Sequence, residues 1–239
     1  MDSRSATPPL LLLSGAGLPA WIWDDVRAEL DAETVVAEYP RRAGAVLGEY
    51  AEAALAQAPA GPVTLVAHSI GGVVASVIVA LAPERVAGVL GVAAVVPAAG
   101  RSFLGALPVP QRYVVGLAMR VAGTRPPEKM IRAGVAAGLP EPVVARLVAD
   151  FAPESQRLYR DRVAAREFTG PRGFVATSRD REFPLALQHR YADTLGAGFR
   201  RELATGHLPM LEAPAASAQA IAEFAADTRG RETPPGVAL

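Results

Sequence analysis

The sequence contains no cysteine, only three histidines and no excess of charge of either sign in its 239 residues. The absence of cysteine excludes a disulfide framework, a thiolate zinc site, an iron–sulfur cluster and a cysteine nucleophile. The histidines are not accompanied by clustered carboxylates, which argues against a metal site. A formal net charge of +0 argues against a dedicated nucleic-acid-binding protein, since such proteins usually carry a basic excess. We therefore expect no metal, no other cofactor and no nucleic-acid partner.

The sequence also lacks a segment that resembles a membrane span or a signal peptide. Its longest apolar run, residues 86–99, is shorter than the roughly 20 residues that a spanning helix needs. Residues 1–9 are polar and lack the apolar stretch and the small-residue cleavage site of a signal peptide. With 51% hydrophobic and 20% charged residues, the composition is that of a globular protein. We expect a cytoplasmic protein, monomeric or homodimeric, with no membrane partner.

Short apolar runs alternate with helical segments along most of the chain. A run that is apolar on both faces is typical of a strand buried in a parallel sheet. Strands are expected at residues 10–13, 34–37, 63–67, 86–96, 173–177 and 199–203. Helices are expected at residues 21–30, 45–58, 70–81, 184–195 and 213–226. This alternation predicts an α/β fold with a mostly parallel sheet of about six strands and helices on both faces.

Residues 97–168 interrupt the alternation. They contain helical patches at 111–121, 127–137 and 142–149, without a clear strand. We therefore expect a core domain formed by residues 1–96 and 169–226, a helical insertion at 97–168 and a flexible tail at 227–239. The insertion carries 10 arginines and Lys129 against 6 acidic residues. This basic balance indicates either an anionic or carbonyl-rich substrate or simply solvated helix faces.

The sequence around Ser69 has the pattern of a nucleophile elbow. Ser69 follows the strand at 63–67 and precedes the helix at 70–81, with Ala67 two residues before it and Gly71 two residues after it. The sharp turn of an elbow requires small residues at both places and holds the serine hydroxyl clear of the sheet. The alternative is a serine that caps a helix in a glycine-rich turn. We predict that Ser69 is a nucleophile.

A serine nucleophile needs a base within hydrogen-bonding distance. His207 follows the last strand and precedes the last helix, so it is expected at the same edge of the sheet as Ser69. His68 is expected to point away from Ser69, because side chains alternate along a strand, and this favours a structural role. His189 lies in a predicted helix beside Arg190 and is expected at the surface. We predict that His207 is the base.

Asp180 follows the strand at 173–177 and is the expected partner of the base. A carboxylate at this position orients the imidazole of His207 and stabilises its charged form. The alternative is an aspartate in a surface turn. Glu182 is close enough in the sequence to replace it, whereas Asp193 is expected to be a solvated helix residue.

The negative charge that develops on a substrate carbonyl requires hydrogen-bond donors. The N–H of Ile70, directly after Ser69, is one expected donor at the N-terminus of the helix. The loop at 14–17, after the first strand, should supply the other, and we assign it to Ala16. The candidate substrate-binding residues beside these positions are Gly15, Trp21, His68 and Leu208.

Together these motifs resemble the α/β-hydrolase superfamily over nearly the whole chain. The chain is most similar to the small esterases whose branch includes plant methylesterases and hydroxynitrile lyases. The resemblance is carried by Ser14-Gly15 with Trp21-Ile22-Trp23, by Ala67-His68-Ser69-Ile70-Gly71-Gly72, by Asp180 with Pro184, and by Gly206-His207-Leu208-Pro209 with Glu212 and Pro214. The nucleophile, acid and base also follow each other in the order of the family. The family implies a helical cap after the fourth strand, which coincides with residues 97–168.

Three positions depart from the family pattern. Members usually have His-Gly where this chain has Ser14-Gly15, and that histidine braces the oxyanion loop. Its replacement is therefore expected to loosen or reshape the oxyanion hole. The hydroxynitrile lyases resembling this branch carry Thr in place of Gly15 and Lys in place of Leu208. Leu208 offers no cation to a cyanide leaving group, which favours an esterase.

The resemblance implies a serine hydrolase that cleaves a carboxylic ester or a lactone. A lyase or cyclase that tailors a natural product with His207 as its base stays open, because the same residues serve both. A binding scaffold with a vestigial triad is disfavoured by the complete set of residues. Apolar residues of the insertion either line a substrate pocket or pack its helices onto the core: Phe103, Leu104, Leu107, Tyr113, Met119, Met130 and Phe151.

Overall fold

The computed structural model describes residues 7–229 of the chain. At its centre lies a sheet of six parallel strands in the order β2-β1-β3-β4-β5-β6. The strands are β1 (Leu10–Leu13), β2 (Thr34–Val36), β3 (Val63–His68), β4 (Val86–Val92), β5 (Arg172–Thr177) and β6 (Phe199–Leu203). This sheet confirms the predicted α/β fold.

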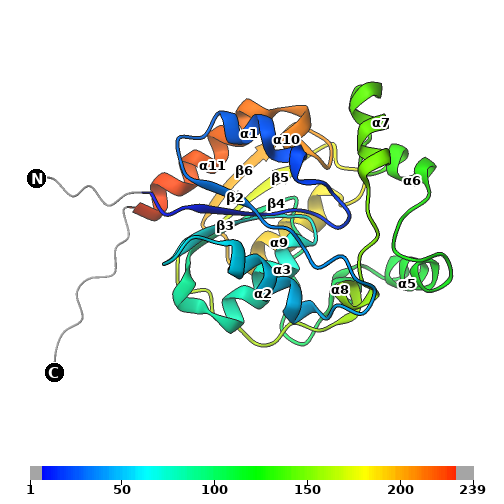
Figure 1. Ribbon diagram of the computed structural model, residues 1–239, viewed down its shortest axis with the longest axis horizontal. Coiled ribbons are helices and arrows are strands. Elements are labelled where there is room, and N and C mark those ends of the chain that lie inside the picture. The colour runs from blue at the N-terminus through cyan, green and yellow to red at the C-terminus, as the bar shows by residue number, and fades with distance from the viewer. Residues whose placement is uncertain (1–6, 230–239) are drawn as a thin grey trace, which may run out of the picture.

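Helices cover both faces of the sheet (Figure 1). One face packs against α2 (Leu47–Gln57), α3 (Gly71–Leu81) and α9 (Leu185–Leu195). The other packs against η1 (Ala20–Trp23), α1 (Asp24–Ala28), α10 (Pro209–Glu212) and α11 (Pro214–Arg229). The fully buried leucines of β1 show why both layers are needed. Leu11 and Leu13 join the core on the α3 side, and Leu10 and Leu12 join the core on the α11 side.

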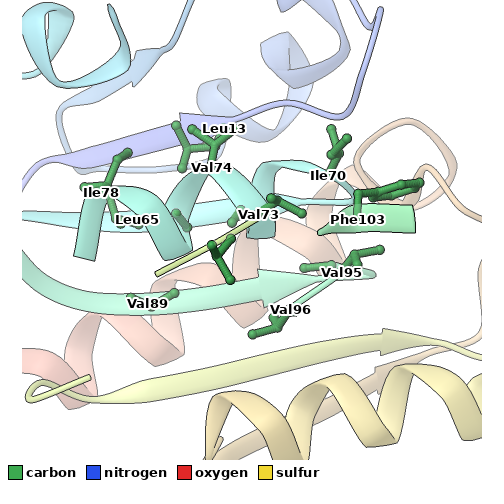
Figure 2. Close-up of a cluster of buried hydrophobic side chains, with 14 of the residues drawn as sticks. Leu13, Leu65, Ile70, Val73, Val74, Ile78, Val89, Val95, Val96 and Phe103 are labelled. Atoms are coloured by element: carbon green, nitrogen blue, oxygen red, sulfur yellow. The ribbon is translucent and has the colours of Figure 1, made fainter. Parts of the chain in front are cut away.

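The core beneath α3 fixes that helix on the sheet. Figure 2 shows Val74 and Ile78 of α3 among side chains of three strands: Leu13 of β1, Leu65 of β3 and Val89 of β4. Burying one such aliphatic side chain contributes about 1.5–3 kcal/mol. The position of the first turn of α3 therefore follows from core packing.

The sheet has a topological switch point beside β1, which lies between β2 and β3. In an open α/β sheet, a crevice forms at such a point, outside the carboxyl ends of the strands. The segment between β4 and β5 folds into helices beyond the same edge (Figure 1). These helices are α4 (Phe103–Ala106), α5 (Gln111–Ala122), α6 (Glu128–Ala133), α7 (Glu141–Asp150) and α8 (Gln156–Arg160).

The fourth strand is shorter than its apolar run predicts. It ends at Val92 instead of residue 96, because Ala93 has a positive φ of 44° and turns the chain. The N–H of Val95 then donates to the carbonyl oxygen of Ser69 at 2.9 Å. The last part of the apolar run thus packs against the serine turn instead of extending the sheet.

Two predicted helices are also shorter. The helix expected at 21–30 divides into η1 and α1 and ends at Ala28, and the helix expected at 127–137 ends at Ala133, where Gly134 follows. The short elements α4, α8, α10 and η2 (Pro83–Arg85) were not predicted, because three to five residues are too few to show helical periodicity.

The predicted tail at 227–239 is described only in part. Helix α11 extends to residue 229, while residues 230–239 and 1–6 lie outside the described residues. Within residues 7–229, no helix is long and apolar enough to cross a membrane.

Helix α3 begins so close to β1 that Gly71 has no room for a side chain. A Cβ at this position would overlap the carbonyl oxygen of Leu13. We expect Gly71→Ala to lower the free energy of unfolding by about 1–3 kcal/mol, the usual cost of overpacking. The matched control is Gly48→Ala in α2, where a Cβ meets nothing within 4 Å. That substitution should stabilise the protein by roughly 0.5–1 kcal/mol. Urea unfolding measures both, and equal stability of the two variants would contradict this packing argument.

Candidate active site

Ser69 occupies a strained turn between β3 and α3. Its φ is 54°, one of two positive values among the described residues other than glycine. The turn is held by hydrogen bonds on both sides of the serine. Its carbonyl oxygen accepts from the N–H of Gly72 at 3.1 Å, and its own N–H donates to Val92 at 3.3 Å. The hydroxyl is thereby carried on a fixed backbone at the carboxyl edge of the sheet.

His207 and Asp180 meet at the same edge, after β6 and β5. The Nδ1 of His207 and the Oδ2 of Asp180 are 2.8 Å apart, and both side chains are buried. Asp180 accepts further hydrogen bonds from the N–H groups of Glu182 at 2.7 Å and Phe183 at 3.1 Å, and from the Thr177 hydroxyl at 3.1 Å. The carboxylate is therefore fixed in orientation before any ligand arrives.

This pairing sets the charges of the two groups. Burial alone would lower the pKa of His207, but Asp180 and Glu182 outweigh it, so the pKa lies above its ordinary value of 6.5. Burial alone would raise the pKa of Asp180, but His207 and the backbone N–H groups hold it below its ordinary value of 3.8. Asp180 is thus a stable anion that favours the charged form of His207.

Ser69 and His207 both line one cavity of about 260 Å³ between the sheet edge and the inserted helices. Its walls are mostly apolar. They come from the loop between β1 and η1, from the inserted helices, and from the loop after β5. They include Ala16, Leu18, Ile70, Phe103, Leu107, Val115, Met119, Met130, Phe151, Tyr159, Glu182 and Phe183. Of the apolar insertion residues considered from the sequence, Leu104 packs in the core and Tyr113 is exposed.

Several hydrogen-bonding groups beside Ser69 have no protein partner within residues 7–229. They are the Ser69 hydroxyl and the backbone N–H groups of Ile70 and Ala16. All three residues belong to the cavity wall. The Ser69 hydroxyl makes no hydrogen bond to His207 among the described residues.

The loop after β1 is braced from three directions. The indole N–H of Trp23 donates to the Ser14 hydroxyl at 3.0 Å, and the Tyr39 hydroxyl donates to the Ser14 carbonyl at 3.2 Å. The N–H of Gly17 donates to a carboxylate oxygen of Glu154 at 3.2 Å. The loss of the family histidine was expected to loosen this loop, but the Ser14 side chain itself takes part in the bracing.

None of the four candidate substrate-binding residues is among those that line the cavity. Gly15 allows the loop to approach Ser69, because a Cβ there would lie 3.1 Å from the Ser69 Cβ. Trp21 donates to Asp150 at 2.8 Å, away from the cavity. Leu208 is buried in the core on the α11 side. His68 is fully buried.

His68 supports the loop that carries His207. Its Nε2 donates to the His207 carbonyl oxygen at 2.8 Å, while its Nδ1 has no partner among the described residues. Burial and the nearby His207 lower the pKa of His68 to about 3. It is therefore neutral, whereas His189 is exposed at the surface.

Sequence reasoning missed Glu154 entirely. This glutamate is 6% exposed and lies on the segment that returns from the insertion. One carboxylate oxygen accepts from Gly17, and the other accepts from the Tyr50 hydroxyl at 2.9 Å. Both partners lie more than 100 positions from Glu154 in the sequence, so no local pattern could have indicated these contacts.

A family model described as the alpha/beta hydrolase family matches residues 10–220. The chain belongs to this family. Membership confirms the resemblance seen in the sequence and places the chain among enzymes of the hydrolase class. A comparison of this sequence with curated proteins found no match.

Solved structures share the fold over nearly the whole chain. An extracellular α/β-hydrolase from a Paenibacillus species has a TM-score of 0.79 at 17% identity, covering 91% of this chain and 98% of that one. Polyneuridine aldehyde esterase has a TM-score of 0.74 at 16% identity, and the match covers 91% of this chain and 99% of that one. A pyrethroid hydrolase from Sphingobium faniae has a TM-score of 0.71 at 20% identity, and the match covers 92% of this chain and 97% of that one. At these identities the similarity shows the fold alone.

The buried carboxyl of Glu154 should make stability depend on pH. Burial raises its pKa above the ordinary value of 4.5, although Gly17 and Tyr50 partly oppose the shift. Because the pKa is higher in the folded state, the protonated carboxyl group contributes to the free energy of unfolding below pH 4.5. This contribution is lost as the pH rises through the folded-state pKa. We expect the stability of the wild type relative to Glu154→Gln to fall as pH rises from 4.5 toward neutrality, measured by urea unfolding. A difference that does not change with pH would contradict it.

Proposed function

We propose that this hydrolase cleaves a carboxylic ester or lactone through an acyl-enzyme on Ser69. The observation that carries the proposal is that the Ser69 turn and His207, which is paired with Asp180 behind it, open into one apolar cavity. The elements required for nucleophilic catalysis by serine are a positioned hydroxyl, a base and a carboxylate that orients the base. Here they come from three separate strand ends.

In the first half of the reaction, Ser69 attacks the substrate carbonyl carbon. His207 takes the hydroxyl proton on Nε2 and becomes imidazolium, which Asp180 stabilises across the 2.8 Å contact at Nδ1. The imidazolium then gives its proton to the leaving alcohol oxygen as the carbon–oxygen bond breaks. The acyl group remains on Ser69.

The negative charge on the carbonyl oxygen needs donors that are already in place. The unpartnered N–H groups of Ile70 and Ala16 are assigned this role. The bracing of Ser14 and Gly17 supports the assignment, since it limits the movement of Ala16 between them. In the second half, His207 removes a proton from water, which attacks the acyl carbon. The bond between that carbon and Ser69 Oγ then breaks, His207 returns the proton to Oγ, and the acid is freed.

The inserted helices are proposed to act as a cap that selects apolar substrates. Phe103, Met119 and Phe151 turn apolar surface toward Ser69. Such walls suit an ester with an alkyl or aryl group on at least one side of the carbonyl. The names of the esterase and the pyrethroid hydrolase with the same fold agree with this substrate class.

A fluorophosphonate probe tests the nucleophile directly. We expect one adduct on the wild type by intact mass, and none on Ser69→Ala, because the probe reacts with an activated serine hydroxyl. The matched control is Ser217→Ala, because the buried Ser217 hydroxyl in α11 has no hydrogen-bond partner within residues 7–229. It should label like the wild type.

Hydrolysis of a panel of esters and lactones completes this test. Ser69→Ala should lose at least about 10³-fold in kcat, in line with removal of a triad member. An absent adduct, together with a substrate that Ser69→Ala still converts, would falsify the acyl-enzyme. That outcome would point instead to lyase or cyclase chemistry with His207 as base.

The pH profile tests the pairing of His207 with Asp180. Because His207 must be neutral to accept a proton, kcat/KM should rise with pH through a pKa above 6.5. In Asp180→Asn the raising influence of Asp180 is gone and burial dominates, so the acid limb should move to lower pH. The rate should also fall by roughly 10⁴-fold, since the imidazole is no longer held in the required tautomer. An acid limb that stays in place would exclude Asp180 as the partner.

A further inference from the structure

Glu182 places a carboxyl group in the wall of the cavity that contains Ser69 and His207. It lies two residues after Asp180, on the loop that follows β5. The mechanism proposed above does not use it. Its surroundings are apolar, with Phe183 and Met130 among the neighbouring wall residues. A carboxyl group in such a place is a strong determinant of what can bind there.

The carboxyl group of Glu182 has no hydrogen-bond or salt-bridge partner within the described part of the chain. Asp180, by contrast, is satisfied by His207 and by backbone donors. The guanidinium of Arg125, the one arginine or lysine of the cavity wall in residues 7–229, donates to the Val148 carbonyl at 2.8 Å. No cationic side chain of the described residues pairs with the carboxylate of Glu182, so a cationic ligand could do so.

The inserted helices leave space for this carboxyl group. A Cβ on Gly134, at the end of α6, would overlap one carboxylate oxygen of Glu182 and lie 3.0 Å from its Cδ. The carboxyl group therefore rests against the bare backbone of Gly134, where only a glycine leaves room for it. Core and insertion contribute together to its position.

We propose that Glu182 makes this enzyme selective for esters that carry a protonated amine on an otherwise apolar group. An ammonium group would donate to the carboxylate, while its alkyl chain packs on the apolar wall. Aromatic rings such as Phe183 would add cation–π attraction. A free carboxylate on the substrate would be repelled. The inference rests on the proposed ester hydrolysis, whose substrate class it narrows.

The electrostatics of the pocket agree with this preference. Burial raises the pKa of Glu182 above its ordinary value of 4.5, and His207 opposes the shift while Asp180 adds to it. A bound cation would relieve both the burial cost and the repulsion from Asp180. Neither a neutral alcohol nor an anion would relieve the charge to the same extent.

Binding to a catalytically inactive protein tests the inference without turnover. Titration calorimetry would compare n-hexylammonium, n-hexanol and n-hexanoate on Ser69→Ala and on the same protein with Glu182→Gln added. We expect the ammonium ion to bind at least about tenfold more tightly than the alcohol, with hexanoate weakest. Glu182→Gln should abolish the preference, while Glu84→Gln, an exposed charge change at the opposite edge of the sheet, should keep it. An equal affinity for ammonium and alcohol, or a preference that survives Glu182→Gln, would overturn the proposal.

Kinetics on the active protein gives the second readout. The substrates are p-nitrophenyl esters of ω-(dimethylamino)alkanoic acids and their carbon isosteres that end in an isopropyl group. The ratio of their kcat/KM values cancels any general effect of Glu182 on His207. That ratio should fall about tenfold or more in Glu182→Gln and also in Gly134→Ala, whose methyl group displaces the carboxyl group.

The two proposals fail in different ways. If the wild type hydrolyses neither ester and takes up no fluorophosphonate, ester hydrolysis is wrong, and the calorimetry still decides the role of Glu182. If both esters are hydrolysed with an unchanged ratio in Glu182→Gln, ester hydrolysis stands and the selectivity is wrong.

Discussion

The close contact between β1 and the first turn of α3 is the constraint on which the site depends. Because Gly71 has no side chain, the turn that carries Ser69 lies directly beside the carbonyl oxygen of Leu13. The loop that follows Leu13 therefore runs past Ser69 and brings Ala16 into the same cavity wall. A positive φ at a residue other than glycine costs roughly 1–3 kcal/mol. Hydrogen bonds to Gly72, Val92 and Val95 hold Ser69 in that conformation.

The other contacts around the site fix loops that the sheet alone would leave free. His68 donates to the carbonyl of His207, and Glu212 accepts from the N–H of Gly206 at 2.6 Å, so the loop after β6 is held at two points. Glu154 ties the insertion to the loop after β1. The insertion therefore supplies the cavity wall and also helps to hold the backbone donors near Ser69.

Much of the fold could be predicted because its causes are local. The leucines of β1 are apolar at each position, and only a strand between two helical layers buries all of them. Small residues on both sides of Ser69 indicated the sharp turn, and chain order then brought Asp180 and His207 to neighbouring strand ends. Boundaries were less accurate where packing overrides the apolar pattern, as at Ala93, which turns the chain inside an apolar run.

The sequence by itself determined the layers of the fold and the three strand ends at which reactive side chains lie, because burial periodicity and turn sterics act over a few residues. Only the tertiary structure decided which groups share the cavity. It bonded Trp21 to Asp150 of the insertion, buried Glu154 beside the loop after β1, and left the Glu182 carboxyl group without a partner among residues 7–229. These outcomes depend on contacts between segments that are distant in the chain. Such contacts are set by how the insertion packs on the sheet edge, and no local pattern in the sequence records them.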